Sequence, residues 1–120
     1  MNMITTVEEL YPYDTFVEDL SIVGNDNLLE PEIRTLRDKA YSIIRRFVGL
    51  SLEDLKDDEA IQAYKDTLFE IVRYTLVTSS EEEYKKYLSV ALSTVMYLRI
   101  AKIDSAPSSF SNANYYANIC

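Results

Sequence analysis

Two runs of consecutive acidic residues have the types and spacing that could bind a metal ion or pair as catalytic carboxylates. The first run is Asp57-Asp58-Glu59 and the second is Glu81-Glu82-Glu83. Both stand where a helix is predicted to begin, and acidic side chains stabilise a helix N-terminus through its dipole. Consecutive residues point around a helix rather than towards one point, and EF-hand ligand spacing is absent. These runs therefore predict helix starts and no metal site.

Nucleophilic catalysis lacks its usual partners in this sequence. The chain has no histidine and one cysteine, Cys120. The missing histidines exclude a Ser-His or Cys-His nucleophile and a Cys/His zinc site, and a single cysteine cannot form a disulfide within the chain. We interpret Cys120 as a free thiol. The sequence thus predicts no catalytic residue, no cofactor and no metal, and the chain is not expected to be an enzyme.

Three arginines, Arg34, Arg37 and Arg45, recur at helical spacing with Tyr41 between them. One interpretation is a set of salt bridges to neighbouring carboxylates, which contribute little to stability at a surface. The other is a docking surface for an acidic partner. Direct nucleic-acid binding is disfavoured because the net charge is −8 and phosphate neutralisation needs clustered Lys and Arg. We therefore expect no sequence-specific nucleic-acid partner.

The elements that must position these residues are predicted to be helices. Two glycines and three prolines in 120 residues leave little room for tight-turned β structure. Apolar residues at helical spacing, together with start and stop residues, predict helices at residues 31–48, 59–77 and 81–102, with a shorter one at 15–22. The predicted fold is all-α: a small antiparallel bundle of about four helices in residues 1–104, followed by an extended C-terminal arm in residues 105–120.

The fourth predicted helix is the one around which the fold is expected to be organised. No charged residue occurs between Lys86 and Arg99. A helix that is apolar nearly all round is normally buried in a core or in an assembly. This stretch is shorter than the roughly 18–20 apolar residues that span a bilayer, so no membrane contact is expected. The chain must supply apolar partners for it, or another subunit must do so.

The C-terminal residues differ from an ordinary solvating tail, which is usually charged and poor in aromatic residues. No charged side chain follows Asp104, while Ser and Asn alternate with aromatic and aliphatic residues. We interpret this segment as a docking arm, with a frayed terminus as the alternative. Its expected contact residues are Phe110, Tyr115, Tyr116 and Ile119.

Residues 27–103 contain, in order, an acid-opened helix, an acidic turn followed by an amphipathic helix, and a last apolar helix. The residues that mark this order are Leu29-Glu30-Pro31-Glu32-Ile33, Ile43-Ile44-Arg45-Arg46-Phe47-Val48-Gly49 and Leu98-Arg99. In this order of parts, residues 27–103 resemble the head–tail connector (adaptor) proteins of tailed bacteriophages.

This resemblance implies a ring of subunits attached below the portal that extends the DNA channel. The implied partners are other copies of the chain, the portal protein and the next neck or tail protein. It also implies a location in the neck of the virion. The first residues carry Glu8 and Glu9 rather than a basic patch and an apolar run, so synthesis in the host cytoplasm without a secretory signal is expected.

A second class of function fits the acidity of the chain. A small acidic inhibitor, such as an immunity protein, an antitoxin or a nuclease inhibitor, would be steered onto a basic protein target by complementary charge. A ring subunit and an inhibitor differ in the mass of the species they form. The first is expected to form, or to be recruited into, a ring, and the second to form a compact one-to-one complex.

Overall fold

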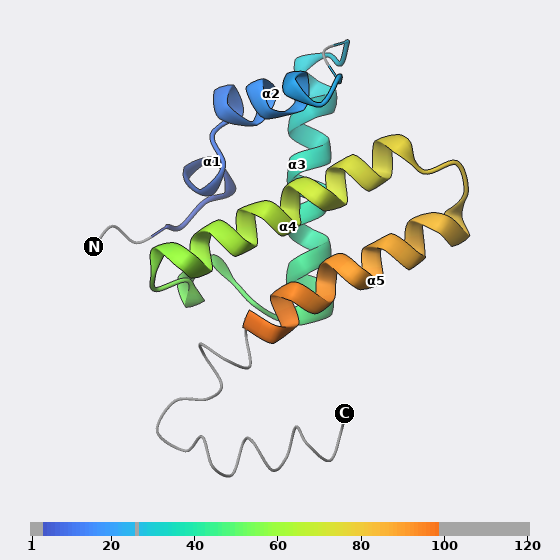
Figure 1. The fold of residues 1–120 in the computed structure, drawn as a ribbon. Helices are drawn as coiled ribbons and strands as arrows, with labels where there is room; N and C mark the ends of the chain where they lie inside the picture. Colours follow the sequence, from blue (N-terminus) through green and yellow to red (C-terminus); the bar gives the residue numbers. More distant parts are fainter. Residues whose placement is uncertain (1–3, 26, 99–120) are drawn as a thin grey trace.

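The computed structural model describes residues 4–25 and 27–98, and all regular structure in these residues is helical (Figure 1). The prediction of an all-α bundle is confirmed. The elements in chain order are α1 (Val7–Leu10), α2 (Tyr13–Ile22), α3 (Glu30–Val48), the short 3₁₀ helix η1 (Leu52–Asp54), α4 (Asp58–Val77) and α5 (Glu81–Leu98).

The predicted helix boundaries agree closely with those observed. Helices α3 and α4 each begin one residue earlier than expected. Helix α2 begins at Tyr13 rather than Thr15, because Pro12 stands directly before the first turn with φ −54° and ψ 145°. A proline is tolerated there since the first amides of a helix have no partner within it. The predicted positions 99–102 of the last helix, and the whole predicted arm, lie outside the described residues.

The acidic runs begin helices, as predicted. The Asp57 carboxylate accepts a hydrogen bond of 2.7 Å from the backbone N–H of Ala60, which caps α4. The Ser80 hydroxyl accepts one of 3.1 Å from the backbone N–H of Glu83, which caps α5. Such caps satisfy amide donors that would otherwise be unpaired. At the other end of α3, Gly49 has φ 74°, in the left-handed region that glycine tolerates best.

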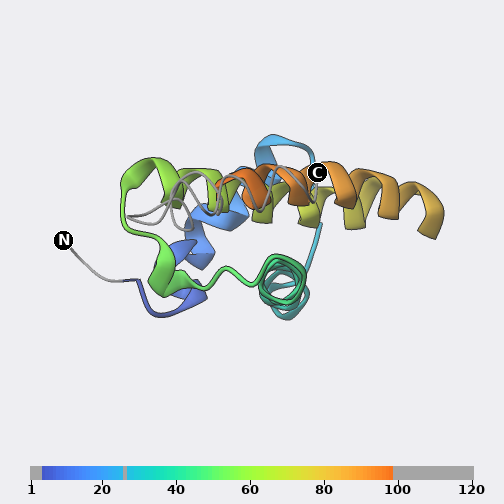
Figure 2. The same cartoon turned by 90° about the horizontal axis from the view of Figure 1, so that it is seen from below.

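Helices α4 and α5 form an antiparallel pair joined by a short turn (Figure 1). Helix α3 runs across one face of this pair instead of alongside it, and Figure 2 shows it nearly end-on beneath the two helices. The N-terminal helices α1 and α2 pack against the side formed by α3 and α4. Because α3 crosses the pair, it covers only part of the length of α5.

The core forms mainly between α4, α3 and the N-terminal segment. Phe16 and Leu20 from α2, and Tyr64 and Leu68 from α4, have no exposed surface. The described side chains of α5 contribute less. The remaining buried apolar residues are Leu10, Tyr11, Ile33, Ala40, Ile44, Val48, Leu50, Leu52, Leu55, Ala60, Ile71, Val72, Ala91 and Val95.

None of the described helices is suited to cross a membrane. Within residues 4–25 and 27–98, no helix combines the length and the apolar character that a bilayer span requires.

Candidate interaction surface

Helix α5 exposes several large apolar side chains. Val90 is 62% exposed and Tyr97 is 73% exposed, and Tyr87 and Met96 also reach the solvent. Burial is confined to the side that faces α3 and α4, where Val95 has no exposed surface. The expectation that this helix needs apolar partners on several sides is therefore met on one side by the chain itself. The other sides are exposed.

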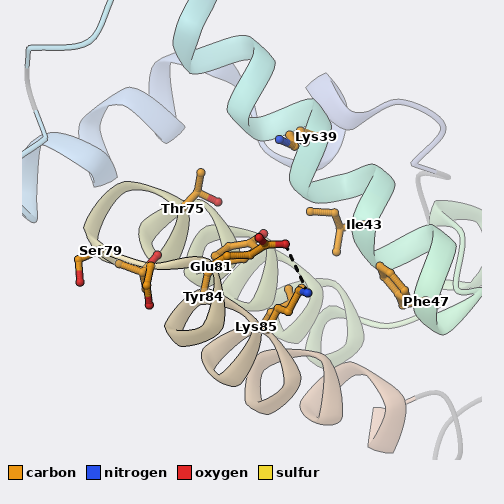
Figure 3. Close-up of a pocket in the computed structure, with 11 residues that line it drawn as sticks. Lys39, Ile43, Phe47, Thr75, Ser79, Glu81, Tyr84 and Lys85 are labelled. Atoms are coloured by element: carbon orange, nitrogen blue, oxygen red, sulfur yellow. Dashed lines mark ion pairs between the residues drawn. The ribbon is translucent and has the colours of Figure 1, made fainter.

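Two hollows lie between α3 and α5, and both include Phe47. The turn-side hollow, of about 700 Å³, lies next to the α4–α5 turn (Figure 3). It has an apolar floor that includes Ile43 and Leu88, but charged side chains also line it. Among these, the Lys85 ammonium lies 3.3 Å from the Glu81 carboxylate.

The tail-side hollow lies at the other end of α5, and its volume is about 470 Å³. None of the described side chains that line it is charged. Ser89 and Ser93 provide its polar groups, and the Ser93 hydroxyl donates a hydrogen bond of 2.7 Å to the backbone carbonyl of Val90. Its other lining residues are Phe47, Val48, Leu92, Met96 and Tyr97.

The local sequence explains why these hollows form where they do. Tyr84, Leu88, Leu92 and Met96 repeat every fourth residue, so they form one row along α5. This row borders both hollows, and the crossing α3 covers it only in part. Phe47 is 58% exposed because it lies beyond that crossing, near the end of α3. Sequence periodicity identifies the apolar residues, but it does not show which of them stay exposed because α3 crosses α5 instead of running alongside it.

The predicted arginine stripe is divided between interior and surface. Arg37 is 5% exposed. Its Nη1 donates hydrogen bonds to Glu8 Oε1 at 2.6 Å and to the Tyr11 carbonyl oxygen at 3.0 Å. The guanidinium thus ties α3 to the N-terminal segment. Arg37 therefore forms salt bridges within the chain, to Glu8 and Asp38.

Arg34 and Arg45 lie nearer the solvent. Arg34 contacts Glu8 at 3.3 Å and Glu30 at 3.4 Å, and its guanidinium lies 4.3 Å from the centre of the Tyr13 ring. Arg45 is exposed farther along the same helix. A docking surface for an acidic partner stays a prediction at these two residues.

Glu8 joins these contacts, and nothing in its sequence surroundings indicates this role. Its carboxylate accepts a hydrogen bond of 2.9 Å from the Tyr13 backbone N–H and also contacts Arg37 and Arg34. The Tyr13 hydrogen bond, followed by that from Arg37, lowers the pKa of Glu8 below its ordinary value of 4.5. The pairing with the arginines is not predictable from local patterns, because the partners lie far apart in sequence.

Other candidate chemistry can be placed only for the described part of the chain. There, no three His, Cys, Asp or Glu side chains gather in a way that could hold a metal ion. The predicted contact residues of the arm, Phe110, Tyr115, Tyr116 and Ile119, lie outside the described residues. The candidate interaction surface is therefore the exposed apolar one on α5 and the end of α3.

Comparison with protein-family models, with curated proteins and with solved structures finds no match to this chain.

Proposed function

We propose that this chain is a structural subunit that assembles into a ring, as a head–tail connector of a tailed bacteriophage. In this role it sits below the portal, extends the DNA channel and presents a second face to the next neck or tail protein. Its partners are other copies of itself and those two neighbours. The proposal assigns no catalytic step to any residue.

The exposed apolar surface of α5 is the observation that supports assembly. Exposed apolar patches on small proteins commonly mark interaction sites, whereas scattered apolar residues do not. Here five of the nine exposed large apolar side chains in the described part of the chain lie on α5 or at the end of α3, and three of these five, Val90, Tyr97 and Phe47, are each more than half exposed. A subunit that contacts copies of itself on two sides would cover such a helix. A one-to-one inhibitor is expected to use a charged surface instead.

The net charge of −8 is compatible with a channel for DNA. Acidic side chains that face a channel repel phosphate groups, so DNA passes without being held. The same charge would also suit an inhibitor of a basic protein. Acidity alone therefore does not separate the two functions.

Particle composition and native mass provide the test. Virions purified from cells that produce the chain are expected to contain it in many copies, and disassembly under mild conditions is expected to release rings or ring fragments. Native mass spectrometry gives the stoichiometry directly. Absence of the chain from purified virions contradicts the proposal. Recovery from the same cells as a one-to-one complex with a basic protein instead supports the inhibitor.

A further inference from the structure

We propose that the tail-side hollow is the docking site for residues 110–119 of a second copy of this chain. This inference rests on the proposed function, because it identifies the contact that would join one ring subunit to the next. It pairs an uncharged aromatic segment with a hollow in which no described side chain is charged.

The chemistry of the two partners matches. The described residues that line the hollow are apolar residues and two serines, and none of them is charged. The segment 110–119 also has no charged residue, and its large side chains are three aromatic rings and Ile119. Aromatic rings bury a large area at low conformational cost, and a tyrosine hydroxyl can remain at a polar rim. Ser89 and Ser93 supply that rim.

The turn-side hollow is the less suitable site for the same segment. Lys39, Glu81 and Lys85 line it, and its Glu81–Lys85 ion pair would lose water on binding an apolar chain. Removing charged groups from water is unfavourable unless the partner replaces their hydrogen bonds. An uncharged segment offers no charge to compensate, so the tail-side hollow is the better match.

Chain length permits the contact. The described part of α5 ends at Leu98, close to Met96 and Tyr97 in the hollow wall. Phe110 follows Leu98 by twelve positions in the sequence, and twelve extended residues span at most about 40 Å. That reach is comparable with the 49 × 38 × 20 Å extents of the molecule, so a segment leaving one copy can reach a hollow on its neighbour.

The proposed ring favours the neighbour's segment over the chain's own. A hollow and a segment are unlike surfaces, so their contact between copies is head-to-tail, and contacts of this kind generate rings when the rotation closes. If each chain filled its own hollow, the same residues would be covered without joining two subunits. The contact between copies therefore accounts for the exposed hollow and for assembly together.

A disulfide test uses Cys120, the chain's one cysteine, as a natural probe next to Ile119. The full-length Ser93→Cys variant places a second thiol in the hollow, and the control Thr94→Cys places it one residue away, where Thr94 lines a different hollow. Diamide takes up the two hydrogens when two thiols form a disulfide. Non-reducing electrophoresis separates linked copies from single chains, and peptide mass spectrometry identifies the bonded residues.

The Ser93→Cys variant is expected to form the disulfide to Cys120 between copies at least about tenfold faster than Thr94→Cys, because docking raises the local thiol concentration. If the introduced thiol of Ser93→Cys instead bonds to Cys120 of its own chain, the hollow belongs to the chain's own segment and the proposal is overturned. Equal rates for the two variants would also overturn it.

A second pair of full-length variants tests the contact without cysteine chemistry. Met96→Glu places a carboxylate in the hollow, whereas the control Ile22→Glu places the same group on α2, at a residue that is 75% exposed and does not line the hollow. Sedimentation analysis is expected to show self-association at least about tenfold weaker for Met96→Glu than for Ile22→Glu. Circular dichroism checks that both variants keep their helices. Equal weakening of association would contradict docking in this hollow.

The outcomes separate this inference from the proposed function. Rings that still form after the double substitution Tyr115→Ser and Tyr116→Ser would keep the connector function and overturn the docking. Crosslinking of Ser93→Cys to Cys120 between copies, found in a protein that is absent from virions, would keep the docking and overturn the connector function.

Discussion

The N-terminal segment, residues 4–23, and helix α5 contrast in how their composition relates to their burial. The N-terminal segment is short, contains Pro12 and carries several acidic residues, yet Phe16 and Leu20 have no exposed surface. Helix α5 has a long stretch without charge, yet Tyr97 is 73% exposed. The apolar content of an element sets how much surface it can bury, whereas its neighbours decide how much of it is buried.

The physical reason for the contrast is the position of each element. Phe16 lies between two other rings, with its centre 4.9 Å from that of Tyr11 and 6.0 Å from that of Phe69, both in edge-to-face arrangements. A few large side chains therefore fix the N-terminal segment against α4. Helix α5 has α4 along one side, and α3 only crosses it (Figure 2). The other described helices therefore leave several sides of α5 uncovered.

The largest expected effect comes from Val95→Asp, at the point where α5 does reach the core. Val95 has no exposed surface, and a buried carboxylate without a partner costs several kcal/mol. A small domain has a total stability of about 5–15 kcal/mol, so this variant is expected to lose its fold. Circular dichroism and thermal melting measure the loss. An unchanged melting temperature would show that α5 does not contribute to the core.

Truncation of Phe16 tests whether the N-terminal segment is as firmly held as its burial indicates. Phe16→Ala removes a fully buried ring and is expected to lower the free energy of unfolding by about 3–5 kcal/mol. Urea unfolding followed by circular dichroism measures this value. A decrease below about 1 kcal/mol, as for an average substitution, would mean that the segment is only loosely attached and would remove the contrast with α5.

Glu8→Gln is expected to have a smaller, pH-dependent effect. The pKa of Glu8 is lowered below 4.5 in the folded state. Its ionised carboxylate therefore makes its full contribution to stability above pH 4.5, and this contribution disappears as the pH falls through the lowered pKa. The difference in melting temperature between the wild type and the variant should therefore shrink on acidification. A difference that is constant from neutral to acidic pH would contradict the role of the charged form.

Val90→Ser is expected to have the smallest effect, since Val90 is 62% exposed. In dilute protein, where association is absent, the free energy of unfolding should change by no more than about 0.5 kcal/mol. The same urea measurement as for Phe16→Ala allows direct comparison. A loss comparable with that of Phe16→Ala would show that the outer side of α5 is covered within the single chain.

The sequence predicted local structure well and contacts between distant segments poorly. The starts of α4 and α5 and the glycine end of α3 depend on neighbouring residues, so Asp57, Ser80 and Gly49 identified them. The pairing of Glu8 with Arg37 joins residues far apart in sequence, and no local pattern indicates it. The hollows depend on the angle at which α3 crosses α5, which periodicity does not encode. Phe47 therefore continues an apolar stripe in the sequence but lies exposed in the fold.

The buried phenols give this protein an optical signal of its own. It has ten tyrosines and no tryptophan, so phenolate absorbance in an alkaline titration reports tyrosines alone. Burial, with a hydrogen bond from its hydroxyl to Asp19, raises the pKa of Tyr11 above the ordinary 10.0. Burial likewise raises the pKa of Tyr64, whose hydroxyl donates to the Leu50 carbonyl at 3.3 Å. Tyr11 and Tyr64 should therefore ionise only at a pH above that of an ordinary phenol, and their phenolate absorbance should appear together with alkaline unfolding.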